Sequence, residues 1–199
     1  MMRVKLCGLR SEADVRTVLE LRPDYAGFIL SGGFRRSIDY DMFITLSAML
    51  RDSDIKRVGV FVNEPLDSLI GKFEEGIDVI QLHGNESEQY ISALRKHTDK
   101  PIIKAFTVKS EADIEAARVS SADYVLLDSG TGTGSTFDHS LIADLGRPFF
   151  LAGGLTPENV GEAITRFEPF AVDASSSLET DGIKDKTKMT VFVSAVRSV

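Results

Sequence analysis

The chain has 199 residues, a mass of 21.8 kDa and a formal net charge of −7 at pH 7. That length suits one domain with a sizeable core, so we expect a single domain over residues 1–199, and the acidic balance predicts no nucleic-acid partner. With no apolar run near the ~18 residues of a membrane span, no opening secretory signal and only one cysteine, we expect a cytoplasmic protein without a membrane partner.

Short apolar runs recur along the chain and predict strands. Neighbouring runs start about 24 residues apart on average, a spacing typical of strand–helix repeats. Most of them, such as 58–62 and 149–152, are apolar almost throughout, which is typical of strands covered on both faces. The eight predicted strands start near Arg3, Tyr25, Arg57, Val79, Ile102, Tyr124, Phe149 and Phe170.

Helix signals fill the segments between these strands. Ser11 precedes a segment, 12–21, whose apolar residues recur at helical spacing. Thr156 is followed by Pro157 and Glu158, which gives an N-cap, a first-turn proline and an early acid in the favoured order. Helices are therefore predicted after Ser11, Ser87, Ser110 and Thr156, and over 184–199, the eighth of the series.

Eight strand–helix units favour a single-domain (β/α)8 barrel, an α/β fold with eight parallel strands, over an open doubly wound sheet. An open sheet has edge strands, which should be shorter or more polar than the rest. Here the first and last runs, VKLCG and FAVDA, are as apolar as the middle ones, as expected if they pair with each other. Gly8 also lacks the following G-x-x-G of a dinucleotide-binding sheet.

Two small-residue motifs near the end of the chain predict a phosphate site. In such barrels catalysis occurs at the C-terminal strand ends, and the loops after the seventh and eighth strands commonly bind phosphate. Gly153 and Gly154 would let backbone N–H groups approach an anion, while Ser175 and Ser176 supply donors where a helix can begin. Each pair alone could be an ordinary turn or helix cap, but both occur in the expected places.

Cys7 and Asp128 end the first and sixth strands, so we expect them to face one cavity from different sides of the barrel. A lone cysteine is commonly a small buried apolar residue, but at a strand end before Gly8 it can act as a thiolate base. Asp128 follows an apolar run, where a carboxylate without a functional partner would be costly. An acid and a base flanking a phosphosugar would suit a cofactor-free isomerase.

Other polar residues near strand ends are candidate substrate ligands. Arg35 and Arg36 could hold a carboxylate as a fork or could be a solvated charge pair. Gln81 and His83 end the fourth strand, and His83 lines the cavity or simply bonds a loop. The glycine-rich loop 130–134 is a weak candidate for a lid. The histidines lack metal-ligand spacing, so we predict no metal.

Motifs along the whole chain occur in the order of one known family. They are VKLCGLR, GFIL, RVGVFVNEP, VIQLHGNE, IIKAF, VLLDSGTGTGSTFD, LAGGLTPENV and VDASSSLETDGIKD. Through them the chain resembles phosphoribosylanthranilate isomerase of tryptophan biosynthesis. The resemblance implies a (β/α)8 barrel that performs an Amadori rearrangement without cofactor or metal. It would convert N-(5-phosphoribosyl)anthranilate into the isomeric 1-deoxyribulose 5-phosphate.

The resemblance also implies roles for individual residues. Asp128 matches the general acid that opens the furanose ring, and Cys7 matches the base that takes the C2 proton. Arg36 matches the residue that holds the anthranilate carboxylate, and Asp173 the one that contacts the ribosyl moiety. With the strand-end residues above, the predicted site comprises Cys7, Asp128, Arg36, Gln81, His83 and Asp173, and for phosphate Gly153, Gly154, Ser175 and Ser176.

The chain departs from the family pattern in two loops. His139 stands where many relatives have tryptophan, after the FD of the sixth-strand loop. The segment 32–34, Gly-Gly-Phe, precedes the two arginines in place of the usual serine-proline or serine-lysine. The choice between Arg35 and Arg36 as carboxylate ligand therefore stays open. We favour Arg36 because of its spacing from Ile38 in the sequence.

Two other interpretations compete with this one. Another cofactor-free phosphosugar barrel, such as indole-glycerol-phosphate synthase or a pentose-phosphate epimerase, would need a lysine–glutamate set or metal-binding histidines at strand ends. Lys5 and Lys104 lie inside their strands instead. A non-catalytic protein that binds a phosphoribosyl ligand would not need Asp128. We expect a small phosphoribosyl substrate as partner, and a chain that is a monomer or a homodimer.

Overall fold

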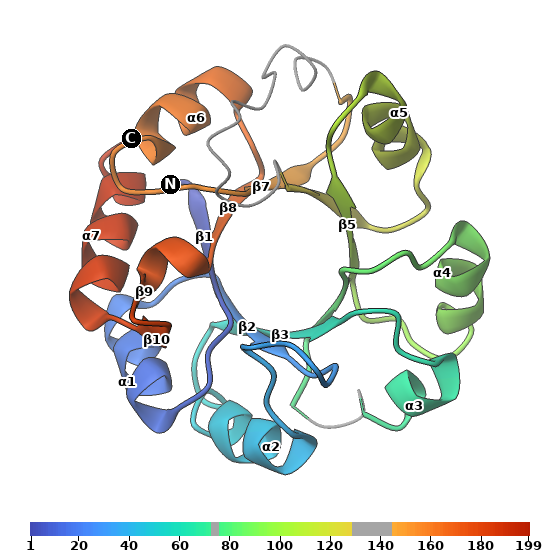
Figure 1. Ribbon diagram of the computed structural model, residues 1–199, viewed down its shortest axis with the longest axis horizontal. Helices are drawn as coiled ribbons and strands as arrows, with labels where there is room; N and C mark the ends of the chain where they lie inside the picture. Colours follow the sequence, from blue (N-terminus) through green and yellow to red (C-terminus); the bar gives the residue numbers. More distant parts are fainter. Residues whose placement is uncertain (73–75, 129–144) are drawn as a thin grey trace.

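The computed structural model of the chain describes residues 1–72, 76–128 and 145–199. Eight parallel strands pair in chain order and close into one barrel, in which β1 lies beside β8 (Figure 1). This closure confirms the predicted (β/α)8 fold and explains why both terminal strands are apolar. The strands are β1 Arg3–Cys7, β2 Tyr25–Ile29, β3 Lys56–Phe61, β4 Val79–Leu82, β5 Ile102–Thr107, β6 Tyr124–Asp128, β7 Phe149–Ala152 and β8 Ala171–Ala174.

Helices surround the barrel and cover its outer face (Figure 1). Residues 129–144, between β6 and β7, lie outside the described residues, and with them the predicted lid at 130–134 and His139. Among the helices that are described, none is long and apolar enough to cross a membrane. These helices are α1 Glu12–Leu21, α2 Tyr40–Ala48, α3 Leu66–Ile70, α4 Glu88–Leu94, α5 Glu111–Val119, α6 Val160–Phe167 and α7 Lys186–Arg197.

Helices α1, α4 and α5 begin directly after Ser11, Ser87 and Ser110, as the serine signals predict. The Ser11 hydroxyl accepts a hydrogen bond from the backbone N–H of Asp14 at 3.2 Å, and the Asp14 carboxylate accepts one from the backbone N–H of Ser11. This reciprocal capping box fixes the start of α1. Ser87 caps α4 in the simpler way, through the backbone N–H of Tyr90.

Helix α6 begins later than predicted, at Val160 rather than at Pro157. The Asn159 side chain accepts a hydrogen bond from the backbone N–H of Thr156 at 2.8 Å, which closes 156–159 into a turn. The Thr156 carbonyl then accepts from the backbone N–H of Val160 at 3.0 Å. Asn159 competes with the cap that the threonine would form, and the proline lies in the turn instead of the first helical position.

Each strand separates two apolar clusters. Val4 and Leu6 of β1 pack in the outer cluster between strands and helices, whereas Cys7 packs in the cluster inside the barrel. Because side chains alternate along a strand, Lys5 shares the inward side with Cys7. The N-terminal end of the interior is filled by contacting aromatic rings, those of Tyr25, Tyr124, Phe150 and Phe170.

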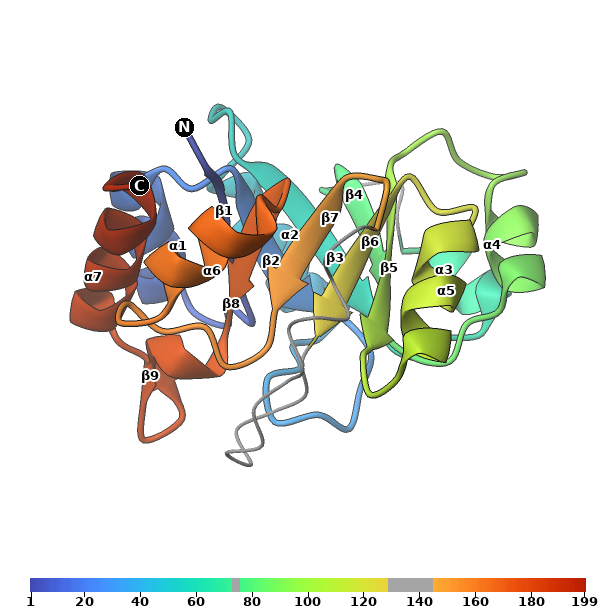
Figure 2. The same cartoon turned by 90° about the horizontal axis from the view of Figure 1, so that it is seen from above.

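The C-terminal strand ends all lie at one end of the barrel. In Figure 2 the arrowheads point toward this end, and the connection from β2 to α2 extends beyond it. A two-stranded hairpin, β9 (Glu179–Thr180) with β10 (Ile183–Lys184), extends from the same end after β8. A short 3-10 helix, Ser176–Leu178, joins β8 to this hairpin. These segments surround the place where the predicted site residues gather.

Candidate active site

A cavity of about 530 Å³ opens at the C-terminal end of the barrel. It is lined from β1, β6 and β8, from the connection after β2 and from the loop after β7. All the predicted site residues except Gln81 line it, so residues far apart in the sequence do meet there. They are Cys7, Arg36, His83, Asp128, Gly153, Gly154, Asp173, Ser175 and Ser176.

Cys7 lies at the edge of this cavity in a closely packed position. A Cβ atom on Gly27 of β2 would come 2.7 Å from the Cys7 Sγ, so the thiol occupies space that only glycine leaves. The Ser175 hydroxyl donates a hydrogen bond to the Cys7 carbonyl at 3.0 Å and joins β1 to the loop after β8. Burial raises the pKa of the Cys7 thiol, and the nearby Lys5 ammonium opposes that effect.

Beneath Cys7, Lys5 and Asp173 form an ion pair inside the barrel. The two residues face each other in the pairing of β1 with β8, and the Lys5 Nζ lies 3.0 Å from both carboxylate oxygens of Asp173. The Lys5 side chain is fully buried and that of Asp173 is 8% exposed. Burial acts to lower the pKa of Lys5, but Asp173 and Cys7 outweigh burial and raise it, so the lysine stays charged.

Asp128 ends β6 beside His83. The His83 Nε2 lies 3.6 Å from an Asp128 carboxylate oxygen, slightly beyond hydrogen-bond distance. The His83 Nδ1 lies 2.8 Å from the Gln81 side-chain nitrogen. Gln81 itself is fully buried below the cavity, and its Oε1 has no partner among the described residues. Gln81 therefore orients His83 rather than lining the cavity.

Arg36 reaches the cavity while its guanidinium is held by Glu179. The Arg36 Nε and Nη2 donate to the two carboxylate oxygens of Glu179 at 2.5 and 3.0 Å. Glu179 also accepts from Arg35 at 2.6 Å and from Lys184 at 3.0 Å. The Arg36 side chain is 22% exposed and that of Arg35 is 59% exposed. Arg36 is thus the more buried of the two arginines.

Arg36 packs against Gly8, the residue that follows Cys7. A Cβ atom on Gly8, which has φ +77°, would lie 2.7 Å from the Arg36 Cδ and 3.0 Å from the Ser175 Oγ. Glycine after Cys7 therefore provides both the left-handed turn and the space for Arg36. Glu179 occupies the Nε edge of the guanidinium, which leaves the opposite edge without a bond to Glu179.

The predicted phosphate ligands lie together on one side of the cavity. Gly153 and Gly154 have φ +90° and +62°, conformations that L side chains rarely adopt. Ser175 and Ser176 lie where β8 turns into the 3-10 helix Ser176–Leu178. This helix has a single turn, so its dipole is small, and the backbone N–H groups and the Ser176 hydroxyl are the donors available to an anion, because the Ser175 hydroxyl donates to the Cys7 carbonyl.

Sequence reasoning did not identify Lys5, Glu179 and Lys184 as site residues. Lys184 donates to the Ser175 carbonyl at 2.9 Å as well as to Glu179, so it joins the serine loop to the arginines. A signal for Lys5 existed in the sequence, because alternation along 3–7 places it on the same side as Cys7. The sequence of the hairpin that carries Glu179 and Lys184 contains no comparable pattern that would have identified these two residues.

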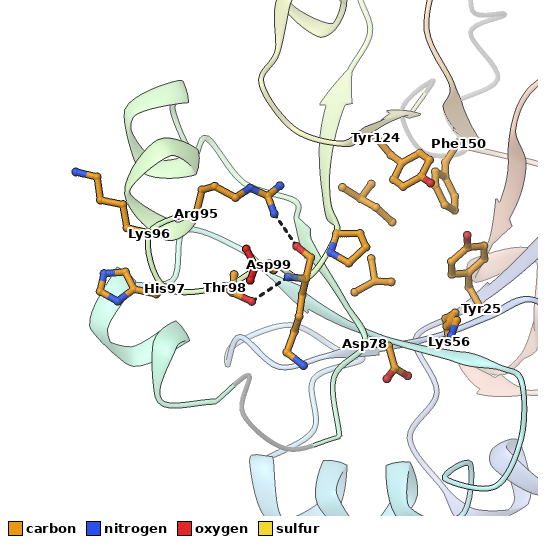
Figure 3. Close-up of a pocket in the computed structure, with 14 residues that line it drawn as sticks. Tyr25, Lys56, Asp78, Arg95, Lys96, His97, Thr98, Asp99, Tyr124 and Phe150 are labelled. Carbon is orange, nitrogen blue, oxygen red and sulfur yellow. Dashed lines mark hydrogen bonds between the residues drawn. The ribbon is translucent and has the colours of Figure 1, made fainter.

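A larger cavity, of about 930 Å³, lies at the opposite end of the barrel and holds none of the predicted site residues. Figure 3 shows Tyr25, Tyr124 and Phe150 directed toward it, with Arg95, Lys96 and His97 at its rim. This is the N-terminal strand end, where residues of such barrels serve stability rather than catalysis. The smaller cavity is therefore the candidate active site.

Comparison with known proteins agrees with this assignment. A family model for N-(5'-phosphoribosyl)anthranilate (PRA) isomerase matches residues 4–195. The chain belongs to this isomerase family. N-(5'-phosphoribosyl)anthranilate isomerase from Endomicrobium trichonymphae is 40% identical over 205 residues, covering 100% of both chains. The enzyme from Thermoanaerobacter strain X514 is 38% identical, again over 100% of both chains.

Solved structures of phosphoribosylanthranilate isomerases show the same architecture. The crystal structure from Thermotoga maritima has a TM-score of 0.91 and 35% identity, with 100% of both chains covered. A complex of such an isomerase with reduced 1-(o-carboxyphenylamino)-1-deoxyribulose 5-phosphate has a TM-score of 0.88 and 34% identity over 100% of both chains. The Thermotoga maritima enzyme is described as dimeric.

Proposed function

We propose that Cys7 and Asp128 are the base and acid of this phosphoribosylanthranilate isomerase, which converts N-(5'-phosphoribosyl)anthranilate into 1-(2-carboxyphenylamino)-1-deoxyribulose 5-phosphate. The observation that carries the proposal is their place in one cavity, at the ends of β1 and β6, together with the two small-residue loops after β7 and β8. A cavity of about 530 Å³ lies in the range of small-molecule sites.

The reaction begins with ring opening. Asp128 gives its proton to the furanose ring oxygen as the C1–O bond breaks, and the nitrogen lone pair forms a protonated Schiff base with C1. The Cys7 thiolate then takes the C2 proton. The C2–H electron pair becomes the C1=C2 bond and the C1=N pair returns to nitrogen, which gives an enolamine. Protonation at C1 and loss of the C2 hydroxyl proton complete the ketone product.

Substrate charge determines how the molecule lies in the cavity. Arg36 binds the anthranilate carboxylate through the guanidinium edge that Glu179 leaves open. Gly153, Gly154, Ser175 and Ser176 bind the phosphate on the side of β7 and β8, and need no resident cofactor or metal. These local donors act against the overall net charge of −7.

Two other side chains contact the middle of the substrate, and a third positions one of them. Asp173 keeps lone pairs for a ribosyl hydroxyl while it pairs with Lys5. His83 contacts the sugar near Asp128, and Gln81 acts on the substrate through His83. With carboxylate and phosphate held at the two ends, the C1–C2 unit lies between Cys7 and Asp128.

The experiment follows the loss of substrate fluorescence after purified protein is added. The wild type should turn the substrate over, while Asp128→Asn and Cys7→Ser should each lower kcat by about 10²–10⁴-fold, the usual contribution of general acid–base catalysis. Asp123→Asn is the matched control, because Asp123 precedes the same strand at its other end and bonds the backbone N–H of Ile102. It should retain kcat.

Two results would contradict this proposal. Substrate binding without turnover by the wild type would indicate a binding protein instead of an isomerase. Full turnover by folded Asp128→Asn would remove Asp128 from the acid role.

We also propose that the enzyme acts in the cytoplasm, as a monomer or a homodimer, on a small phosphoribosyl substrate. A reducing compartment supports this location because Cys7 must remain a thiol to serve as the base. Sedimentation at several protein concentrations distinguishes the two oligomeric states.

A further inference from the structure

Lys5 is a buried cation next to the proposed base, and the proposed reaction does not use it directly. Its side chain has no exposure, and it extends inward from the same strand and the same side as Cys7. An ammonium group has three donors. Two of them point to Asp173 at 3.0 Å each, and the charge of Lys5 also acts on the Cys7 thiol two residues along the strand.

Cys7 needs a cationic neighbour because it lies in a poorly solvated place. A thiol is a base only after it ionises, and burial disfavours the thiolate. The charges of four residues affect the ionisation of the Cys7 thiol. Lys5 lies on β1, Asp173 on β8, Arg36 in the β2–α2 connection and Lys184 on β10. Asp128 and His83 line the same cavity.

Lys5 differs from the other two cations near the thiol. Arg36 and Lys184 both donate to Glu179, at 2.5 and 3.0 Å, so a carboxylate separate from the thiol holds them. Lys5 lies two residues from Cys7 on the inward side of the same strand, and its charge is the largest that opposes the effect of burial on the pKa of the thiol. Charge interactions are strongest where water is excluded.

We propose that Lys5 is a positioning residue for the base: its ammonium group stabilises the Cys7 thiolate that accepts the C2 proton, and Asp173 keeps that ammonium charged and directed. Lys5 itself stays protonated throughout, and the proton moves from C2 to the Cys7 sulfur. This inference rests on the proposed function only in that Cys7 is the base.

The test titrates Cys7 in the substrate-free protein through its ultraviolet thiolate absorbance. Cys7 is the single cysteine of the chain, so the signal reports on it alone, and Cys7→Ser provides the blank. Lys5→Met alone leaves Asp173 buried and unpaired, which could prevent folding. The informative comparison is therefore wild type against the double variant Lys5→Met/Asp173→Asn, which removes the buried pair as a unit.

We expect the double variant to lower the thiolate fraction at neutral pH by about tenfold relative to wild type, equivalent to about one pH unit in the titration midpoint, because the charge of Lys5 affects Cys7 more than that of Asp173 does. The kcat–pH profile of folded Lys5→Met should move to higher pH in the same direction. A merely structural lysine would change stability or KM without moving either midpoint.

The chain offers a matched control at Lys104. Lys104 is also buried and paired with a carboxylate, that of Glu86 at 2.9 Å, but it lies on β5 away from Cys7. Lys104→Met/Glu86→Gln removes an equivalent buried pair and should leave the thiol titration unchanged.

An unchanged midpoint in the folded Lys5→Met/Asp173→Asn variant, relative to wild type, would overturn the inference. An equal shift in the Lys104 control would do the same, because it would show a general effect of destabilisation. The titration needs no substrate. A wild type that fails to isomerise would therefore contradict the proposed function while the role of Lys5 beside Cys7 is still measured.

Discussion

The Arg36 guanidinium and the Glu179 carboxylate form a two-bond ion pair, with N–O distances of 2.5 and 3.0 Å. The Glu179 side chain is only 4% exposed, and Lys184 donates to it as well. Planar pairs of this kind fix direction as well as distance. Glu179 therefore determines which edge of the Arg36 guanidinium remains open for the carboxylate that we propose it binds.

Replacing Glu179 should affect acid stability in a defined pH window. Burial acts to raise the pKa of Glu179, but hydrogen bonds from Arg36 and Lys184 lower it from 4.5 to about 2. A lowered folded-state pKa stabilises the protein above the unfolded value, and this stabilisation is lost as pH falls toward the folded value. Glu179→Gln should thus cost about 3 kcal/mol near neutral pH.

Urea unfolding of wild type and Glu179→Gln at a series of pH values checks this expectation. The difference in the free energy of unfolding should be constant above about pH 5 and shrink below it, as Glu179 protonates in the wild type. A difference that is independent of pH down to about pH 3 would show that the charge of Glu179 is not the source.

Separate substitutions of the two arginines distinguish their roles. Arg36→Met should raise KM for phosphoribosylanthranilate by about 10–100-fold, since it removes a charge-assisted bond to the substrate carboxylate. Arg35→Met is the matched control and should change KM less than about threefold, because the Arg35 side chain is 59% exposed. Steady-state kinetics with both variants decides, and the reverse order of effects would assign the carboxylate to Arg35.

Gln81 and His83 should act as one unit. Gln81→Leu removes the bond to the His83 Nδ1, so the histidine loses its orientation beside Asp128. We expect Gln81→Leu and His83→Asn each to lower kcat by about tenfold, and the double variant to be little worse than His83→Asn alone. Multiplicative effects in this double-mutant cycle would mean that Gln81 acts independently of His83.

Negative charge in the serine loop should weaken substrate binding selectively. Ser176→Asp places a carboxylate at the predicted phosphate position without removing the Ser175 bond to the Cys7 carbonyl. KM should rise by more than tenfold while kcat changes little. Inorganic phosphate should also lose its competitive inhibition. A variant with wild-type KM would show that the phosphate binds elsewhere.

The fold could be predicted from the sequence because each strand carries its own signal. Continuous apolar runs mark strands covered on both faces, and β2, for example, begins at Tyr25 as expected. The predicted start of α6 was wrong because the Asn159 side chain accepts a hydrogen bond from the backbone N–H of Thr156, and this bond competes with the cap expected at Thr156. Such competition depends on local geometry that residue preferences do not contain.

The site was predictable where a strand end carries the residue, as at Cys7 and Asp128. It was not predictable where the contact depends on pairing register or on a loop. Lys5 lies opposite Asp173 only because β1 pairs with β8 in one register, and the sequence of neither strand specifies it. Glu179 reaches Arg36 through the fold of a hairpin after β8.

Lys184 bonds both the Ser175 carbonyl and Glu179, at 2.9 and 3.0 Å. A single cation therefore joins the loop that we propose binds the phosphate to the carboxylate that holds Arg36, the proposed ligand of the other end of the substrate. Ordering of one end lowers the conformational cost of ordering the second, and such coupling is reciprocal. Anthranilate and inorganic phosphate, offered as separate fragments, should each tighten the binding of the other in this enzyme.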